Sequence, residues 1–251
     1  MRLPSLNIFE KYAHIDPGGP SLPRPQPSDW AFNFFGEQES LFFVEVGAYD
    51  GVGCSNCLLF EEAYNWDGIC IEPHPESFRQ LEINRPRPKK YNLGLSSTGG
   101  TLEFWQVNGS AASLSGFKDF FDDDHESRIY EEIEKHGGDV EKKEIESVRL
   151  EDLLKENNIK RINYLSIDAE GADFDILESI NFDEVAIDFI SCERSDSPEQ
   201  IYKVAQFLAS KGFLPAGWCC ADIFYWKPLQ QHQDHKKRRK GGRLRHEAQC
   251  R

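Results

Sequence analysis

The chain of 251 residues is predicted to fold as an α/β protein with a doubly wound, mainly parallel β-sheet. Short apolar runs recur along the sequence without the alternation of a half-exposed strand, which indicates strands buried on both faces. Segments of helical periodicity separate these runs, as in a sheet whose parallel strands are joined by crossover helices. A glycine-rich turn follows the first run, at the position where such sheets bind their ligands.

The first strand is predicted at 41–46, and it ends in a turn whose glycines follow the pattern G-x-x-x-G-x-G from Gly47. Glycine lets a ligand approach the backbone closely, and the next helix, with Ser55 as its N-cap, points its positive end at that ligand. The turn lacks the G-x-G-x-x-G pattern of dinucleotide sites and contains Asp50. This carboxylate would repel a diphosphate but tolerate a cationic sulfonium, unless it merely bonds its own turn. The turn therefore favours S-adenosylmethionine over NAD.

The second strand is predicted at 68–71, and Glu72 follows it. Glu72 lies about 25 residues after Gly47, close to the spacing of roughly 20 residues for the acid that binds a ribose in a nucleotide-binding βαβ unit. Its two oxygens can accept hydrogen bonds from both ribose hydroxyls. Alternatively, Glu72 caps the helix that begins after Pro73. His74 could likewise contact adenine or cap that helix.

The remaining elements follow from the same criteria and complete the alternation of strands and helices. Further strands are predicted at residues 91–95, 101–107, 145–148, 162–167, 185–192, 213–218 and 223–226. Helices are predicted at residues 58–63, 78–83, 129–135, 149–156, 176–180 and 201–208. Residues 108–116 are small and polar, which predicts a loop.

One domain is predicted over residues 40–228, between two irregular segments. Residues 1–39 form a Pro-rich lead-in, whose aromatic residues at 30–35 could form a short helix on the sheet or across the ligand site, with core packing favoured. Residues 117–147 are strongly acidic and form an insertion or lid that could select the substrate. Residues 229–251 are basic and polar, which predicts a disordered tail.

Acidic residues lie at four predicted strand ends or turns along one edge of the sheet, namely Asp50, Glu72, Asp168 and Glu193. The carboxyl ends of parallel strands meet at one edge, and carboxylates beside a buried sheet must be solvated, paired or bound to a ligand. Single surface acids are common, but a set at successive strand ends favours a functional site. Asp168 and Glu193 could together hold Mg²⁺ through oxygen ligands. The sequence offers no clear third ligand, so Mg²⁺ is possible but not favoured.

The segments VEVGAYDG, IEPHPESF, YLSIDAEGADFDIL and FISCE occur in this order within residues 40–228. As an ordered set they resemble the FkbM family of S-adenosylmethionine-dependent methyltransferases, most of which are O-methyltransferases. The resemblance implies a class I, Rossmann-like sheet of seven strands, with one antiparallel strand here at 222–226. It also implies the cofactor-binding residues, which are Glu45, Gly47, Ala48, Tyr49, Asp50, Gly51, Glu72, Pro73 and Asp168.

Asp168, Glu170 and Gly171 match the family's D-x-E-G motif, directly after the strand at 162–167. Strand alternation would send Asp168 and Glu170 to the same side, with Asp168 towards the methyl end of the cofactor. Methyl transfer to a hydroxyl needs the oxygen in line with the sulfonium, and a base often takes the proton. Asp168 or Glu170 is the candidate catalytic base, and Glu170 could instead bond N–H groups of the loop and hold the site rigid.

Charge and composition limit the partners and the compartment. The net charge is −14, although residues 235–251 contain eight Lys or Arg and one Glu, so the rest of the chain is strongly acidic and disfavours a nucleic-acid substrate. No signal peptide or apolar run of membrane-spanning length is found, so no membrane association is predicted. Seven cysteines, an odd number, suit free thiols in the cytoplasm, while Lys236–Lys240 could be a nuclear address.

The predicted function is S-adenosylmethionine-dependent methylation of a hydroxyl on a small molecule or glycan. The alternative is a catalytically silent methyltransferase-like module that binds partners, and its mark would be a damaged cofactor turn. A nucleotide-dependent oxidoreductase is less favoured because the G-x-G-x-x-G pattern is missing. The sequence identifies neither the methyl acceptor nor the oligomeric state.

Overall fold

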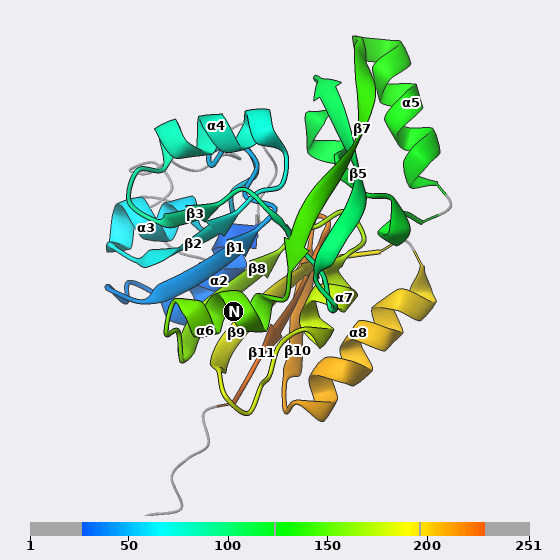
Figure 1. The fold of residues 1–251 in the computed structure, drawn as a ribbon. Helices are drawn as coiled ribbons and strands as arrows, with labels where there is room; N and C mark the ends of the chain where they lie inside the picture. The colour runs from blue at the N-terminus through cyan, green and yellow to red at the C-terminus, as the bar shows by residue number, and fades with distance from the viewer. Residues whose placement is uncertain (1–26, 123, 196, 229–251) are drawn as a thin grey trace, which may run out of the picture.

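The computed structural model describes residues 27–122, 124–195 and 197–228. The predicted basic tail, with its candidate nuclear address, and most of the predicted Pro-rich lead-in lie outside these residues. The described part contains two β-sheets, of seven and four strands, with helices packed around the larger one (Figure 1). No helix in this part is long and apolar enough to cross a membrane.

The larger sheet has the strand order β10-β11-β9-β8-β1-β2-β3. Its strands are β1 Phe42–Val46, β2 Asp67–Ile71, β3 Lys89–Tyr91, β8 Arg161–Ile167, β9 Ala186–Glu193, β10 Leu214–Cys219 and β11 Asp222–Trp226. β11 pairs antiparallel with β9 and with β10, and the other neighbouring strands pair in parallel. The predicted α/β class, the seven strands and the single antiparallel strand are confirmed. The strand order reverses between β1 and β8, where such sheets form a crevice at their carboxyl ends.

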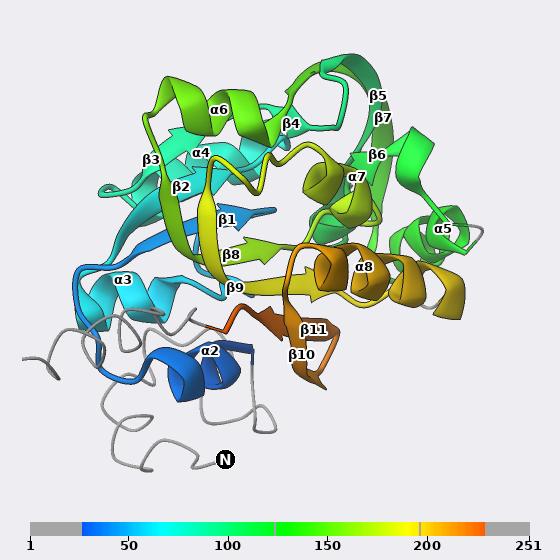
Figure 2. The same ribbon diagram turned by 90° about the horizontal axis from the view of Figure 1, so that it is seen from below.

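Helices cover both faces of this sheet (Figures 1 and 2). On one face lie α2 Pro27–Phe35, α3 Leu58–Tyr64 and α4 Pro75–Asn84, and on the other α6 Leu150–Glu156, α7 Asp173–Glu178 and α8 Pro198–Ser210. Adjacent strand residues enter opposite clusters, so that Phe43 packs with the first set of helices and Val44 with the second. This burial on both faces explains why the strands are continuous apolar runs in the sequence.

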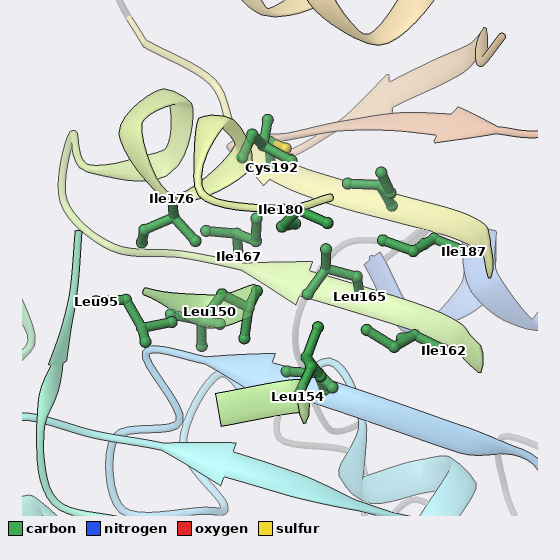
Figure 3. Close-up of a cluster of buried hydrophobic side chains, with 14 of the residues drawn as sticks. Leu95, Leu150, Leu154, Ile162, Leu165, Ile167, Ile176, Ile180, Ile187 and Cys192 are labelled. Atoms are coloured by element: carbon green, nitrogen blue, oxygen red, sulfur yellow. The ribbon is translucent and has the colours of Figure 1, made fainter. Parts of the chain in front are cut away.

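The cluster on the second face consists largely of aliphatic side chains (Figure 3). Leu165 and Ile167 of β8, Ile190 of β9 and Ile176 of α7 are all essentially buried there. Close packing of such side chains fixes the ends of β8 and β9 relative to each other. The residues that follow these two strands are thereby held in defined positions.

α2 is the short helix predicted from the aromatic residues at 30–35, and it packs on the sheet (Figure 2). Trp30 stacks on Phe224 with ring centroids 5.3 Å apart, and Phe35 meets Trp66 edge-on at 4.9 Å. The favoured core-packing role is therefore confirmed. No residue of α2 lines the ligand cavity described below.

The smaller sheet differs most from the prediction. Its strand order is β4-β7-β5-β6, and the long antiparallel pairing of β5 with β7 makes a ribbon that projects beyond the larger sheet (Figure 1). Its strands are β4 Gly94–Leu95, β5 Gly100–Gly109, β6 Gly116–Phe117 and β7 Gly138–Val148. α5 His125–His136 lies beside the ribbon, and two 3-10 turns, η1 Ala112–Leu114 and η2 Lys118–Phe120, lie between β5 and α5. The loop predicted over 108–116 thus contains η1 and runs into β6.

Two predicted strands are corrected by this second sheet. The strand predicted at 91–95 is divided between the two sheets, because Asn92 turns the chain by donating from Nδ2 to the carbonyl oxygens of Glu72 at 2.8 Å and Pro73 at 3.1 Å. The edge strand predicted at 145–148 is the end of β7, which has 11 residues. Most of β7 is charged and exposed, so no apolar run marks its beginning.

Candidate functional site

A cavity of about 420 Å³ lies at the carboxyl ends of β1, β2 and β8, beside the reversal of strand order. Its volume is typical of small-molecule sites. The apolar lining residues include Ile71, Pro73, Leu93, Leu95, Phe104 and Phe117, and the polar ones include Tyr49, Glu72, Asp168, Glu170 and Glu193. The cavity therefore offers an apolar surface for a flat ring system together with several carboxylates for polar groups.

The glycine turn after β1 has a conformation that other residues would strain. Gly47 has φ +75°, and a Cβ atom there would lie 1.8 Å from the carbonyl oxygen of Asp168. Gly51 has φ +81°, and its Cβ would lie 2.6 Å from Cγ of Arg85. Both positions combine a left-handed backbone with a close neighbour, which only glycine accommodates. The turn is thus packed tightly between the end of β8 and the end of α4.

Glu72 joins the turn after β1 to the turn after β2. Its Oε2 accepts a hydrogen bond from the N–H of Tyr49 at 2.8 Å, and its Oε1 accepts one from the N–H of His74 at 2.7 Å. The side chain is buried at the cavity wall, and desolvation raises its pKa to about 7 despite these two bonds. Each carboxylate oxygen can accept a second hydrogen bond. Glu72 is therefore positioned to accept from a pair of ligand hydroxyls once it is ionised.

His74 is the N-cap of α4, which is one of the two roles predicted for it. Its Nδ1 accepts a hydrogen bond from the N–H of Ser77 at 3.2 Å, and its Nε2 lies 3.1 Å from the carbonyl oxygen of Val107. A carbonyl oxygen only accepts, so Nε2 carries the proton and donates it. Both ring nitrogens are occupied, and His74 does not line the cavity.

Glu45 does not line the cavity. Its Oε1 accepts a hydrogen bond from Oγ of Ser55 at 2.7 Å, and its Oε2 pairs with Nη1 of Arg85 at 3.2 Å. Arg85 is fully buried, also pairs with Glu61, and donates to the carbonyl oxygen of Gly51 at 3.0 Å. Glu45 and Arg85 thus hold the glycine turn from behind. Sequence reasoning missed Arg85, because a buried ion pair between distant segments leaves no periodic signal.

The predicted cofactor residues fall into two groups, those that line the cavity and those that lie behind it. Gly47, Tyr49, Glu72, Pro73 and Asp168 line the cavity, whereas Glu45, Ala48, Asp50 and Gly51 do not. Oδ1 of Asp50 accepts hydrogen bonds from the N–H groups two and three residues later, at 2.9 and 2.6 Å, so Asp50 closes its own turn. Ala48 is buried, and its N–H donates to the carbonyl oxygen of Ile71 at 3.1 Å. Direct contact of this second group with a cofactor stays a prediction.

Three carboxylates converge at the ends of β8 and β9. One oxygen from each of Asp168, Glu170 and Glu193 lies within 4.8 Å of the others. Desolvation raises the pKa of Asp168 to about 6, and desolvation with repulsion from Glu193 and Asp168 raises that of Glu170 to about 9. Asp173 lies beside them, but its oxygens accept from the N–H groups of Glu193 at 2.8 Å and Ala169 at 3.3 Å. Asp173 therefore positions the two strand ends.

Glu170 connects this cluster to α5. Its backbone has φ +48°, and its Oε2 accepts a hydrogen bond from Nη2 of Arg128 at 2.8 Å and lies 3.3 Å from Nδ1 of His125. Nε2 of His125 lies 3.0 Å from the carbonyl oxygen of Leu114 and donates to it, so a neutral His125 has only a lone pair on Nδ1. One proton shared between Glu170 and His125 then satisfies both groups. The alternative prediction is that Glu170 bonds N–H groups of its loop. Among the described residues, its side chain instead contacts side chains of α5.

A second cavity of about 400 Å³ adjoins the first and shares Glu170 and Glu193 with it. α5, α7 and α8 supply half of its other lining residues. Acids outnumber bases in the lining, where Arg128, Arg194 and Lys203 are the cations. The carboxylate cluster thus lies at the boundary between two cavities of similar size. The acidic segment at 117–147, for which a lid role is predicted, contributes to both cavities.

Comparison with curated proteins finds no match. Among solved structures, the methyltransferase FkbM from Methylobacillus flagellatus is 10% identical with a TM-score of 0.46, over 88% of this chain and 58% of that one. Precorrin-6y C5,15-methyltransferase from Geobacter metallireducens is also 10% identical with a TM-score of 0.41, over 80% of this chain and 87% of that one. The N-terminal domain of human METTL16, solved in complex with SAH, is 12% identical with a TM-score of 0.41, over 90% and 72%. The family model of the methyltransferase FkbM domain matches residues 45–215, and the chain therefore belongs to this family.

Proposed function

We propose that the protein is an S-adenosylmethionine-dependent O-methyltransferase that acts on a hydroxyl of a small molecule or sugar. The observation that carries this proposal is the pair of adjoining cavities in a chain of a methyltransferase family, with Glu72 in the first and a carboxylate cluster at their boundary. One cavity suits the cofactor and the other suits the acceptor. The carboxylates at the boundary are then next to the reacting atoms.

The first cavity fits the cofactor in size and in the chemistry of its lining. Glu72 would accept from the two ribose hydroxyls, and the apolar residues around Leu93 and Phe104 would pack against the adenine. Gly47 and Asp168 lie where the amino-acid end would bind. When bound, S-adenosylmethionine supplies a methyl group activated by a sulfonium. The protein's part is to bind this group, exclude water and place the acceptor oxygen in line with it.

The two candidate bases differ in their protonation. With a pKa of about 6, Asp168 is mostly ionised at neutral pH and can accept the proton of the acceptor hydroxyl. With a pKa of about 9, Glu170 keeps at neutral pH the proton that it shares with His125, so it is not available as a base. Asp168 is therefore our candidate base. We assign Glu170 the role of holding the acceptor and tying the cluster to α5.

We do not expect the methyl acceptor to be a nucleic acid. Asp119, Asp122 and Glu178 line the second cavity in addition to the cluster acids. These carboxylates would repel a phosphate backbone and favour a neutral or cationic acceptor with several hydroxyl or amine groups.

Calorimetric titration with S-adenosylhomocysteine, and with NAD⁺ beside it, tests the cofactor. We expect micromolar binding of the first and none of the second. Binding of NAD⁺ alone would replace the proposal by a nucleotide-dependent oxidoreductase, and binding of neither would leave a catalytically silent module. If S-adenosylhomocysteine binds, methyl transfer from labelled cofactor to hydroxylated metabolites, glycans and an RNA oligonucleotide then tests the acceptor. Methylation of the RNA alone would overturn the acceptor class.

A further inference from the structure

We propose that Asn56 and Ser166 are positioning residues, which fix the glycine turn, residues 47–57, on the strand that precedes Asp168. They do so through a row of buried polar side chains that crosses the larger sheet below the first cavity. Neither residue lines a cavity, so neither is placed to touch a ligand. Their effect on the cofactor rests on the proposed function, whereas their effect on the turn needs no ligand.

The buried polar row takes one residue from each of four neighbouring strands. Glu45 of β1 is the register partner of Cys70 of β2 and of Ser166 of β8. Ser166 is in turn the register partner of Ser191 of β9, and all four side chains are buried. The row lies on the face that α2, α3 and α4 cover, since Cys70 and the residues two positions before the other three belong to the core cluster of that face.

Each member of the row lies two residues before a residue that lines the first cavity. From β2 to β9 these lining residues are Glu72, Gly47, Asp168 and Glu193. On the opposite face of the sheet the next residue of each strand belongs to the aliphatic cluster, namely Ile71, Val46, Ile167 and Cys192. The polar side chains are therefore confined to one face, in the layer below the cavity.

Three consecutive residues of the turn are bonded to this row. Oγ of Ser55 donates to Oε1 of Glu45 at 2.7 Å, and the N–H of Cys57 donates to the same oxygen at 3.2 Å. Between them, Asn56 donates from Nδ2 to Oγ of Ser166 at 3.1 Å. Glu45 lies on β1 and Ser166 on β8, so the turn is tied to both strands at the reversal of strand order.

A chain of hydroxyl groups holds Ser166 from the other side. Oγ of Ser191 donates to Oγ of Ser166 at 3.2 Å and lies 2.9 Å from the hydroxyl oxygen of Tyr164. All three side chains are buried, where a hydroxyl group without a hydrogen bond is costly. A connected polar network of this kind favours one arrangement of its members. The chain thus orients the oxygen that receives the hydrogen bond of Asn56.

The bond between Asn56 and Ser166 sets the position of one cavity wall relative to another. Gly53 and Cys54 line the first cavity just before the bonded part of the turn, and Asp168 lines it two residues after Ser166. Binding and methyl transfer both depend on such alignment. Loss of this one hydrogen bond would loosen the turn while the strands of the sheet stay paired.

Asn56→Ala and Ser166→Ala remove the bond from either end, and amide hydrogen exchange of the full chain, followed by mass spectrometry, measures the turn. We expect exchange over residues 51–58 to become about three- to tenfold faster in each variant, the effect of one neutral hydrogen bond. Ser179→Ala is the matched control. Ser179 is equally buried, lines neither cavity, accepts from the N–H of Leu150 at 3.1 Å and donates to the carbonyl oxygen of Ile176 at 2.6 Å.

The control separates a local role from general destabilisation. Ser179→Ala should lower the midpoint of urea unfolding about as much as Ser166→Ala, because each removes a buried hydroxyl, and should leave exchange over residues 51–58 within about twofold of the wild type. Exchange over these residues that is unchanged in Asn56→Ala and Ser166→Ala, or equally fast in the control, would overturn the proposal.

Calorimetric titration with S-adenosylhomocysteine tests the consequence for the cofactor. Each single variant should bind about three- to tenfold more weakly, and the double variant should be within about twofold of the weaker single one, because both changes remove the same bond. Additive losses, or wild-type affinity in a variant whose turn exchanges faster, would refute the positioning role. If the wild type binds no S-adenosylhomocysteine, the cofactor assignment fails, and hydrogen exchange alone decides whether Asn56 and Ser166 hold the turn.

Discussion

Glu72→Gln is the substitution that tests the cofactor site most directly. It keeps the size of the side chain and removes its charge and one acceptor oxygen. In the wild type both oxygens already accept backbone N–H groups, from Tyr49 at 2.8 Å and His74 at 2.7 Å. In the variant the amide NH₂ must face one of these N–H groups and one of the ribose hydroxyls as a donor. The substitution therefore acts on the loop and the ligand at the same point.

The expected loss of affinity follows from the hydrogen bonds involved. A hydrogen bond to a charged group contributes about 1.5–3 kcal/mol, so S-adenosylhomocysteine should bind about 10- to 150-fold more weakly to the variant. The pKa of Glu72 is about 7, and the proposed ribose contact requires the ionised form. Affinity for the wild type should therefore be about tenfold lower at pH 6 than at pH 8. The variant should bind equally at both pH values.

The pH dependence of protein stability provides an independent test of the raised pKa of Glu72. The folded-state pKa of Glu72 is raised from 4.5 to about 7, so the folded protein holds this proton more tightly than the unfolded chain. The contribution of Glu72 to stability is then greatest below pH 4.5 and is lost as the pH rises through 7, with a total of roughly 3 kcal/mol. Gln has no proton to lose, so its melting temperature relative to the wild type should rise from pH 5 to pH 8.

Calorimetry at pH 6 and pH 8, with differential scanning at the same values, measures both effects. Glu76→Gln is the matched control, since Glu76 is an exposed acid in the first turn of α4. If Glu72→Gln binds S-adenosylhomocysteine within about threefold of the wild type at pH 8, the ribose assignment is wrong. If the wild type shows no pH dependence, the raised pKa is not linked to the ligand.

Three further substitutions test the frame and the chemistry. Asp168→Asn should slow methyl transfer in a single-turnover assay by about 10²–10⁴-fold, and an unchanged rate would remove Asp168 as the base. Arg85→Met leaves two buried glutamates without their partner and should lower the free energy of unfolding by about 3–5 kcal/mol in urea, whereas a loss under about 1 kcal/mol would show the ion pairs to be dispensable. Gly47→Ala should abolish cofactor binding and lower the free energy of unfolding, because its Cβ would clash with Asp168. Gly36→Ala is the control, since Gly36 has a similar positive φ but no atom within 4 Å of a Cβ, and it should lower the free energy of unfolding by only about 1–2 kcal/mol. Equal effects of the two substitutions would mean that the clash with Asp168 is relieved at little cost.

The larger sheet could be predicted from the sequence because its signals are local. Its central strands β1, β2, β8 and β9 are largely buried, and each stands out as a short apolar run such as Ile162–Ile167 between polar turns. The ribbon could not be predicted in the same way. β5 pairs Glu103 with Glu144 and Trp105 with Lys142, and most of β7 is exposed. Register alone defines such a ribbon, and a single sequence does not contain the register.

Those residues of the site that lie at the ends of predicted strands could be predicted from the sequence. Gly47, Glu72, Asp168 and Glu193 follow directly from strand ends, and the structure brings all four to one cavity. The residues that complete the site come from segments distant in the chain and are not marked by any strand end. Arg85 belongs to a buried ion pair, and α5 supplies Arg128 and His125 through a segment whose excess of acid suggests only a solvated surface.

The ribbon with α5 has a consequence for how proteins of this architecture can diversify. It is inserted between the strands that carry Glu72 and those that carry Asp168, and α5 reaches the carboxylate cluster through one residue, Glu170. The ribbon is bound to the larger sheet's surroundings, for example through Val107 and His74, but its end projects beyond that sheet and can be lengthened, shortened or exchanged with little change to the sheet beneath it. Recognition of new acceptors can then evolve in this module, while the machinery that would hold the methyl donor is inherited intact.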